Sequence, residues 1–427
     1  MKLKFSLWLL LIQVLIGYSQ TNGLGQPSDL FGQYLTMEPP EIIKDLGEEN
    51  ENGVKLRKVI FHSYFYNDKG KKKNAEIFAA IARPAKDGKY PGLLALHGGA
   101  GYAEIDRAKK WAALGYIVVV LDEPGVADPD KIPMSHGPWE NYKYGENRFV
   151  VKPDLKSSTL FSAVLASVQG LYLLNSQSDV IKDKIGITGV SWGGYLTTFI
   201  SGLANSTVTA SFSVFGSGFY DEGSTFLKYL DSMSSEDRSL WLQYLDAGRV
   251  TKNIKTPFFI AAAANDNWFY PPAVSQTLNS IKGNTNHLFA PNNSHKIELP
   301  GGTQGKIPEE PGWLAMERVY FEYYLKGIGK PLPKITKIKT TKLKKGKIKV
   351  RFKVNSILPV EKPTVSVSQD GNAWPKKIWD SVDAENLNNG WFEVIIPREE
   401  AGGAFFCFAS ISDSRPVTVS SKILRIN

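Results

Sequence analysis

Residues 185–194 hold the feature that most constrains this chain, because they join a short apolar strand to a helix through a glycine-flanked serine. The sequence there is Ile-Gly-Ile-Thr-Gly-Val-Ser-Trp-Gly-Gly, with Ser191 between Gly189 and Gly193. Glycines at these places lack the side chains that would collide in a sharp turn. Such a turn lifts the serine Oγ above the sheet at a helix N-terminus, where developing negative charge is favoured. The pattern predicts a nucleophile, although an ordinary glycine-rich turn also fits G-x-S-x-G.

Apolar runs and helical patterns alternate around this turn. Unbroken apolar strands separated by helices predict an α/β architecture, a mostly parallel sheet with helices on both faces. An antiparallel pair of strands, residues 58–66 and 75–83, is expected to lead into that sheet. Further strands are expected at residues 92–96, 116–121, 185–190, 208–215, 257–264 and 287–290, and helices at residues 103–114, 155–174, 194–204, 272–281 and 313–325.

The first residues have the features of a targeting segment. Lys2 and Lys4 precede the apolar run Leu7–Ile16, which is shorter than the ~20 residues that span a membrane. We interpret residues 1–19 as a signal peptide cleaved after Ser19, with a membrane anchor as the alternative. No later run looks apolar and long enough to cross a bilayer, so no transmembrane segment is expected. The protein is therefore expected to be exported to the periplasm or the extracellular space.

The remainder divides into three parts by composition and period. Residues 20–52 are polar and indicate a loose N-terminal lead, and residues 53–330 carry the α/β pattern. Residues 334–427 show an apolar period of two and predict a small all-β, sandwich-like domain. The chain's one cysteine, Cys407, stands in an apolar run there, so a buried thiol and no internal disulfide are expected.

Positive charge is concentrated at the start of this β domain. The segment Lys334–Lys353 holds ten Lys and Arg and no acidic residue, and the remaining 41 basic residues would balance the 42 acidic ones. We call this segment the basic ribbon. Its alternation places bases on one face and apolar side chains on the core face from residue 347 to 354. The basic ribbon fits an edge strand whose lysines block aggregation, or a track for an anionic glycan or membrane surface. No nucleic-acid partner is expected.

A nucleophilic serine needs a base and an orienting acid, which should follow it along the chain in the order acid, then histidine. Asp266 lies in the turn after the apolar strand 257–264, and His295 lies 29 residues later in a loop after the last expected strand. One helix and one strand fit between them, which places both at neighbouring strand ends. The alternatives are a solvated turn aspartate at 266 and His287 as the base.

An oxyanion hole needs two N–H donors. We expect one from Trp192, directly after the nucleophile, and one from Gly99 in the loop His97–Gly101, whose glycines allow an inward bend. His97 itself is expected to brace that loop.

Two long insertions, residues 125–152 and 223–245, interrupt the alternation, and the second is expected to be helical. Long loops at strand ends of such a sheet are where sites are built. Trp268, Trp139 and His136 are the candidates for contact with substrate. Aromatic rings there could stack on sugars, and core packing is the equal alternative for them.

Residues 55–328 resemble the α/β-hydrolase group that contains dienelactone hydrolases, acetyl xylan esterases and prolyl oligopeptidase-like enzymes. The matching motifs are His97-Gly-Gly99, Gly189-Val-Ser-Trp-Gly-Gly194, Asp266, His295 and the closing-helix sequence 321–327. The resemblance implies an α/β-hydrolase fold, a Ser191–His295–Asp266 triad, and acyl transfer without metal or cofactor. A dienelactone hydrolase would usually carry a cysteine nucleophile. Prolyl oligopeptidases carry a large N-terminal propeller, which the short lead here cannot form.

These inferences favour an exported serine esterase. The expected substrate is an acyl ester, with acetyl on a polysaccharide as the leading candidate because the protein is expected to be exported and carries aromatic residues near the site. Two alternatives stay open. One is a serine peptidase that cleaves short peptides with the same residues, and the other is a protein that chiefly binds acidic glycans.

Overall fold

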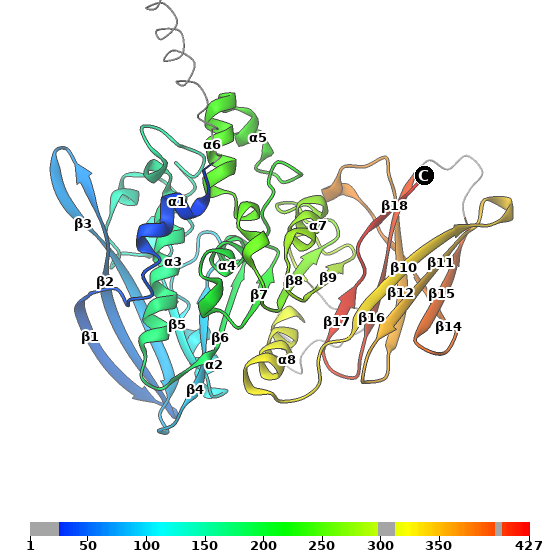
Figure 1. Ribbon diagram of the computed structural model, residues 1–427, viewed down its shortest axis with the longest axis horizontal. Helices are drawn as coiled ribbons and strands as arrows, with labels where there is room; N and C mark the ends of the chain where they lie inside the picture. The colour runs from blue at the N-terminus through cyan, green and yellow to red at the C-terminus, as the bar shows by residue number, and fades with distance from the viewer. Residues whose placement is uncertain (1–24, 298–311, 398–403) are drawn as a thin grey trace, which may run out of the picture.

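The computed structural model describes residues 25–297, 312–397 and 404–427 (Figure 1). The expected signal peptide, residues 1–19, lies outside these ranges. The larger part of the structure is a nine-stranded sheet in the order β1-β2-β3-β5-β4-β6-β7-β8-β9. Its strands are β1 (Ile42–Glu51), β2 (Val54–Asp68), β3 (Lys71–Pro84), β4 (Tyr90–Leu96), β5 (Ile117–Leu121), β6 (Val180–Val190), β7 (Ala210–Val214), β8 (Phe258–Ala263) and β9 (Thr285–Ala290).

The strand directions match the pattern of the sequence. The strands from β5 through β4 to β9 run parallel, each hydrogen-bonded to its neighbour. By contrast, β1, β2, β3 and β5 pair in antiparallel fashion. Strands β4, β5, β7 and β8 carry almost entirely buried side chains, as their unbroken apolar runs predict. The prediction of a mostly parallel α/β sheet is therefore confirmed.

Helices cover both faces of this sheet. Alternate residues of β6 show the two faces: the Thr188 hydroxyl donates to Glu317 on one side, whereas a Cβ added to Gly189 would lie 2.9 Å from the Thr197 hydroxyl on the other. Helix α8 therefore lies on the first face, with α2 packed beside it, and α4 lies on the second with α3. The helices are α2 (Ile105–Ala113), α3 (Thr159–Ser176), α4 (Trp192–Leu203), α7 (Pro271–Ser280) and α8 (Gly312–Lys326), and α5 (Leu227–Asp231) and α6 (Ser235–Leu245) form the second insertion.

Helix α3 corrects one expectation. It is long and apolar enough to cross a membrane by length and composition, although no such run was expected after the first residues. Of its apolar window, 83% is buried inside the protein, and it packs on β4, β5 and α4. The helix is apolar all round because it is covered on all sides, as core helices are.

The N-terminal lead is another difference from expectation. Residues 42–51 are not loose but form β1, which pairs with β2 along its whole length. Nearly every side chain of β1 is exposed, so the strand carries no alternating apolar pattern by which it could be recognised. Backbone hydrogen bonds to the longer β2 hold it at the edge of the sheet.

The C-terminal region forms two antiparallel sheets, to the right of the large sheet in Figure 1. Apolar side chains of β11, β15 and β16 are buried between them, so the expected β domain is present. Cys407 is fully buried, and burial raises the pKa of its thiol to about 12. One sheet holds β10 (Lys334–Lys342), β11 (Ile348–Asn355), β15 (Trp391–Ile396) and β14 (Glu385–Asn386), and the other holds β13 (Asp380–Asp383), β12 (Glu361–Gln369), β16 (Phe405–Ser412), β17 (Thr418–Ser420) and β18 (Leu424–Ile426).

The basic ribbon occupies two strands of the first sheet. Strand β11 alternates buried and less buried residues as predicted, but it lies between β10 and β15 and is not an edge strand. The edge is β10, which carries the first half of the ribbon. Lys349 and Arg351 both pair with Glu393 on β15, so part of the positive charge is neutralised locally.

The two parts of the chain share a continuous apolar interface beside β9. Phe289 of β9 packs against Phe408 of β16, and the Phe289 N–H donates to the Ser420 hydroxyl of β17 at 2.8 Å. The Asn286 amide donates to the Pro333 carbonyl at 2.8 Å. The parallel sheet therefore does not end in water at β9, because the β domain covers that edge.

His287 lies at this interface, and its burial makes the free energy of unfolding of the protein depend on pH. Burial lowers the pKa of His287 to about 4. Since an unfolded imidazole titrates near ~6.5, the unfolded chain binds more protons between these values, and the free energy of unfolding falls as the pH drops below about 6.5. We expect the wild-type protein to lose about 2 to 3 kcal/mol more than His287→Leu between pH 7.5 and pH 4.5. Urea denaturation at both pH values measures this difference, and equal losses would contradict it.

Candidate active site

The serine turn is built as its glycines predict. Ser191 follows β6 directly with φ 57°, in the left-handed region that non-glycine residues rarely occupy. Its N–H donates to the Val214 carbonyl at 2.8 Å, which ties the turn to β7. A Cβ on Gly193 would lie 2.5 Å from the carbonyl oxygens of Leu96 and His97, so only glycine fits beneath the serine. The strained turn places the Ser191 hydroxyl at the start of α4.

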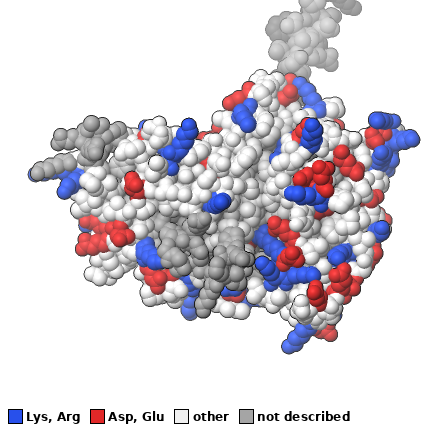
Figure 2. All heavy atoms as spheres, turned by 180° about the vertical axis from the view of Figure 1, so that it is seen from behind, with Lys and Arg blue, Asp and Glu red and all other residues white. Residues whose placement is uncertain are grey.

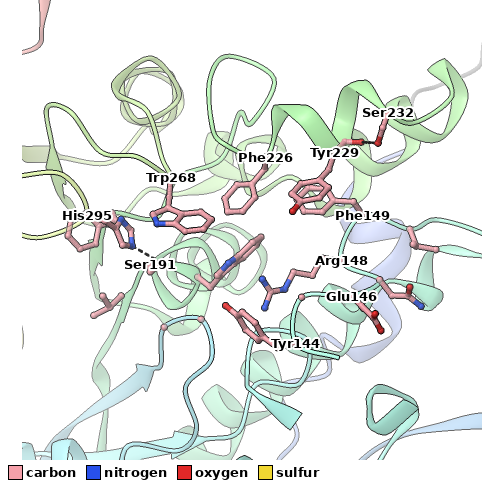
Figure 3. A pocket seen from close by; sticks show the side chains of 18 residues that line it. Tyr144, Glu146, Arg148, Phe149, Ser191, Phe226, Tyr229, Ser232, Trp268 and His295 are labelled. Carbon is pink, nitrogen blue, oxygen red and sulfur yellow. Dashed lines mark hydrogen bonds between the residues drawn. The ribbon is translucent and has the colours of Figure 1, made fainter. Parts of the chain in front are cut away.

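Ser191, His295 and Asp266 form one hydrogen-bonded series, and Figure 3 shows the contact between Ser191 and His295. The His295 Nε2 lies 2.9 Å from the Ser191 Oγ, and its Nδ1 lies 2.9 Å from the Asp266 Oδ2. Asp266 is fully buried, whereas His295 is partly exposed to the cavity. The Phe215 ring packs on the imidazole with 4.2 Å between the ring centres. This geometry lets His295 take the serine proton while Asp266 fixes the tautomer with Nδ1–H.

Backbone donors fix the Asp266 carboxylate in this orientation. Its Oδ1 accepts hydrogen bonds from the N–H groups of Trp268 and Phe269, at 2.7 and 3.0 Å. The His295 Nδ1 faces both carboxylate oxygens, at 2.9 Å from Oδ2 and 3.1 Å from Oδ1. The preceding residue, Asn265, accepts from the N–H groups of Asn293 and Ser294 at 2.9 and 3.1 Å. The turn after β8 therefore contains Asp266, and through Asn265 it also fixes the loop that carries His295.

The loop His97–Gly101 passes beside Ser191, and its Gly98 and Gly99 line the cavity next to the serine. The N–H of Ala100 donates to Val126, the N–H of Gly101 donates to Gly98, and the N–H of His97 faces the Glu123 carboxylate. A Cβ on Gly98 would lie 3.8 Å from the Cβ of Ser191, which shows how near this loop passes to the serine. Gly99 also lies against Trp192, where an added Cβ would come within 2.8 Å of the indole. The two expected oxyanion donors, Gly99 and Trp192, are thus neighbours beside Ser191.

His97 braces the loop, as expected. Its Nε2 accepts from the Glu123 N–H at 3.1 Å, and its Nδ1 donates to the Gly98 carbonyl at 2.7 Å. Burial lowers the pKa of His97 to about 4 and raises the pKa of Glu123 well above its ordinary value. The His97 imidazole is therefore neutral at physiological pH, and it shapes the glycine loop without adding positive charge beside the serine.

The histidine loop is also tied to the β domain, through a contact that spans 87 residues of sequence. The Asn292 amide donates to the Trp379 carbonyl at 2.7 Å, and the Trp379 N–H donates back to the Asn292 side chain at 2.8 Å. Trp379 is itself 2% exposed and packs on Phe408. Asn292 is a positioning residue in this arrangement, because it fixes the backbone three residues before His295 without touching the reacting atoms.

We expect Asn292→Gly to lower kcat by threefold to about a hundredfold, with little change in KM, since small misplacements of a catalytic group have effects of this size. Glycine suits the φ of 56° at this position, so the variant removes the two hydrogen bonds without adding backbone strain. The free energy of unfolding should fall by about 2 kcal/mol, at roughly 1 kcal/mol for each hydrogen bond. Steady-state kinetics and urea denaturation measure both effects.

Asn292→Asp provides the matched comparison. It keeps the acceptor for the Trp379 N–H and sets a carboxylate against the Trp379 carbonyl, so it should lower kcat as well. Loss of stability with unchanged kcat in both variants would show that the contact holds the domains together without positioning His295.

A cavity of about 840 Å³ opens beside the serine. Figure 3 shows its walls: aromatic side chains from the two insertions surround the space next to Ser191, and Arg148 extends between them. Residues 144–150 of the first insertion form one wall, and Phe226 and Tyr229 of the second form another. Trp268 completes the rim near His295 and is 44% exposed. Both insertions therefore contribute to the site, as long loops at strand ends are expected to do.

Of the three residues expected to contact substrate, the structure places one at the cavity and two away from it. Trp268 lines the cavity, whereas Trp139 is 2% exposed and lies in the core. His136 pairs through its backbone with Glu76 of β3 and through its ring with Glu140, away from the cavity lining. The expectation that Trp139 and His136 contact substrate is therefore not supported. Tyr144, Phe149 and Arg148 of the same insertion face the cavity instead, and a count of aromatics in the loop could not distinguish among them.

Metal chemistry was not expected at this site. Within the described ranges of the chain, no group of three or more His, Cys, Asp and Glu side chains is placed to hold a metal ion.

Comparison with known proteins assigns the chain to a family. The family model of Acetyl xylan esterase (AXE1) matches residues 48–300. Among solved structures, the chain is similar to acetyl xylan esterase 1 from Thermoanaerobacterium sp. JW/SL YS485, with 19% identity and a TM-score of 0.56 over 75% of this chain and 100% of that one. It is also similar to the acetyl xylan esterase from Paenibacillus sp. R4, with 17% identity and a TM-score of 0.52 over 70% of this chain and 93% of that one. The chain belongs to the acetyl xylan esterase family and is a serine carboxylic ester hydrolase.

Proposed function

We propose that this protein removes acyl groups, acetyl in particular, from esterified polysaccharides outside the cytoplasm, using Ser191, His295 and Asp266. The observation that carries this proposal is the hydrogen-bonded series of the three side chains at the edge of an aromatic cavity. Membership of the acetyl xylan esterase family supports acetyl as the acyl group. The basic n-region and apolar run before residue 20 support export.

The chemistry follows from the geometry. His295 removes the proton of Ser191 as the oxygen attacks the ester carbonyl, and the N–H groups of Trp192 and Gly99 are the proposed donors to the resulting oxyanion. His295 then passes the proton to the departing alcohol, which leaves an acyl-serine. Water, activated by the same imidazole, releases the acid and restores the serine. Asp266 keeps its charge throughout and stabilises the imidazolium.

The test is a substrate panel with the purified full-length protein. Acetylated xylan and 4-nitrophenyl esters with acyl chains of two to eight carbons are compared with aminoacyl anilides. We expect acetate release from the polymer and a fall in kcat/KM as the acyl chain lengthens. Hydrolysis of the anilides with no release of acetate would contradict the proposal and favour a peptidase with the same three residues.

We further propose that the basic ribbon, Lys334–Lys353, brings an anionic glycan to the enzyme. The exposed lysines of β10 support this, although on the face seen in Figure 2 basic and acidic side chains are interspersed. Retention on a uronate polymer should fall steeply between 0.1 and 1 M salt, where the Debye length drops from ~10 to ~3 Å. Changing Lys337, Lys339 and Lys347 to Gln should weaken it. Retention that resists salt, or that is equal in the triple variant, would remove this role.

A further inference from the structure

Arg148 is a buried cation in the wall of the active-site cavity, and its charge has no counterpart there. The residue is 6% exposed, and its Nη2 is buried without a hydrogen-bond partner. Burial lowers the pKa of Arg148, and among the described residues tyrosine side chains, Tyr144 first, partly offset this effect. A guanidinium nevertheless stays charged at neutral pH. Burying a charge without an opposite charge is unfavourable, so this arrangement needs a reason.

The surroundings hold the guanidinium in place without neutralising it. Its Nε donates to the Gly125 carbonyl at 2.6 Å, and the group lies between two aromatic faces, 4.4 Å from the Tyr144 ring centre and 4.7 Å from that of Trp192. Its backbone carbonyl accepts from the Ser158 hydroxyl and from the Trp241 indole. Stacking on two rings compensates part of the desolvation. The side chain is thus pre-organised, and among the described residues its Nη2 has no hydrogen-bond partner.

The acidic residue nearest in sequence does not supply the missing charge. Glu146 also lines the cavity, but its carboxylate accepts from the Lys143 N–H at 2.9 Å. Figure 3 shows it on the far side of Arg148 from Ser191. Throughout the described part of the chain, Arg148 forms no ion pair with an Asp or Glu side chain.

The guanidinium lies close to the place where the chemistry is proposed. Trp192, whose ring it contacts, follows Ser191 directly, and its N–H is a proposed oxyanion donor. The Tyr144 hydroxyl lies against Gly99, the other proposed donor, where an added Cβ would be within 2.3 Å of it. A substrate group bound by Arg148 would therefore lie close to the ester bond that Ser191 is proposed to attack.

We propose that Arg148 binds a carboxylate of the substrate, so that the preferred substrates are esters that also carry a carboxylate near the scissile bond. A planar guanidinium with free N–H groups fits a carboxylate better than it fits a neutral hydroxyl. This inference rests on the proposed function and narrows its substrate class. The carboxylate can stand in the alcohol part, as in an acetylated uronic acid, or in the acyl part, as in a monoester of a dicarboxylic acid.

Two matched substrate pairs test the inference and separate these sources. Acetylated glucuronic acid is compared with its methyl ester for the alcohol part, and benzyl hydrogen succinate with benzyl methyl succinate, by benzyl alcohol release, for the acyl part. We expect kcat/KM to be at least about tenfold higher for the free acid in one pair. If the wild-type protein shows no preference for the free acid in either substrate pair, the inference is overturned. This measurement needs no variant.

Variants then assign the preference to Arg148. In Arg148→Gln the ratio of the two kcat/KM values should fall to within about threefold of unity, and Arg148→Lys should give an intermediate ratio because it keeps the charge without the planar fork. Lys143→Gln is the matched control, since it removes an exposed positive charge from the same loop and should leave the ratio unchanged. A ratio that is unchanged in Arg148→Gln, or lost equally in Lys143→Gln, would overturn the assignment.

A binding measurement separates failure of this inference from failure of the proposed function. With Ser191→Ala protein, calorimetric titration should show tighter binding of acetylated glucuronate than of its methyl ester. Tighter binding without turnover by the wild-type protein would retain the carboxylate site and reject the proposed deacetylation. Turnover of neutral and charged esters at equal rates, with equal binding, would retain the proposed function and reject the carboxylate site.

Discussion

Ser191→Ala is expected to reduce kcat for acetyl esters by about 10⁴- to 10⁶-fold, because the variant lacks the oxygen that attacks the carbonyl. The fold should survive this change. The Ser191 side chain faces the cavity, and the N–H that ties the turn to Val214 belongs to the backbone, which alanine keeps. Alanine tolerates the φ of 57° about as poorly as serine, so little additional strain is introduced.

The measurement is the initial rate of acetate release at saturating substrate, with thermal denaturation as the check on folding. A variant that keeps more than about a tenth of wild-type kcat would lose only about 1.4 kcal/mol of transition-state stabilisation, which is too little for removal of a nucleophile. Such a result would move the nucleophile elsewhere. The residual rate of a true nucleophile variant should not respond to an acyl-fluoride or phosphonate inhibitor that inactivates the wild-type enzyme.

Asp266→Asn is expected to lower kcat by about 10³- to 10⁴-fold while KM changes little. The reason lies in the way the carboxylate is held. Its Oδ1 accepts two backbone N–H groups, which an asparagine carbonyl oxygen would also do. The Asn amide NH₂ would then stand where Oδ2 now lies, 2.9 Å from the His295 Nδ1. This donor favours the tautomer in which His295 accepts at Nδ1 and carries its proton on Nε2, and an imidazole in that tautomer cannot take the proton of Ser191.

Asp266→Ala is the comparison that isolates the tautomer effect. It removes the carboxylate but imposes no donor on Nδ1, so a fraction of the imidazole can still take the productive tautomer. We expect Asp266→Asn to be at least as impaired as Asp266→Ala, although asparagine conserves size and most hydrogen bonds. Near-wild-type kcat in Asp266→Asn would exclude Asp266 as the orienting acid, and His295 would then need another partner.

The parts of this protein that the sequence determined are those that depend on neighbours along the chain. Gly189 and Gly193 are needed because the backbone around Ser191 closes on itself within a few residues, so the turn can be recognised from the local pattern. The apolar runs of β4 to β8 are buried on both faces, which leaves an unambiguous signal of a covered parallel sheet. Even the pairing of Asp266 with His295 follows from local spacing, because both stand at the ends of adjacent strands.

Strand β1 and the inner position of β11 were decided only by tertiary structure. Nearly every side chain of the first is exposed, and the strand is held by backbone hydrogen bonds to β2, which no pattern of side chains records. The second depends on which strands pair across the sheet, and β15 joins it from 40 residues further along the chain. Strand order is a long-range property that period alone does not contain.

The contacts of Arg148 and Asn292 at the site were also decided only by tertiary structure. Arg148 stands in a polar loop, where an arginine is ordinarily solvated, and it becomes buried only because Tyr144 and Trp192 close around it. Asn292 meets Trp379 across 87 residues because the β domain docks on the edge of β9. The sequence alone predicted the three residues of the proposed triad, which the structure brings together because of a sharp turn and neighbouring strand ends. Folding decided what surrounds them, because burial and partners of a side chain depend on contacts between segments far apart in the chain.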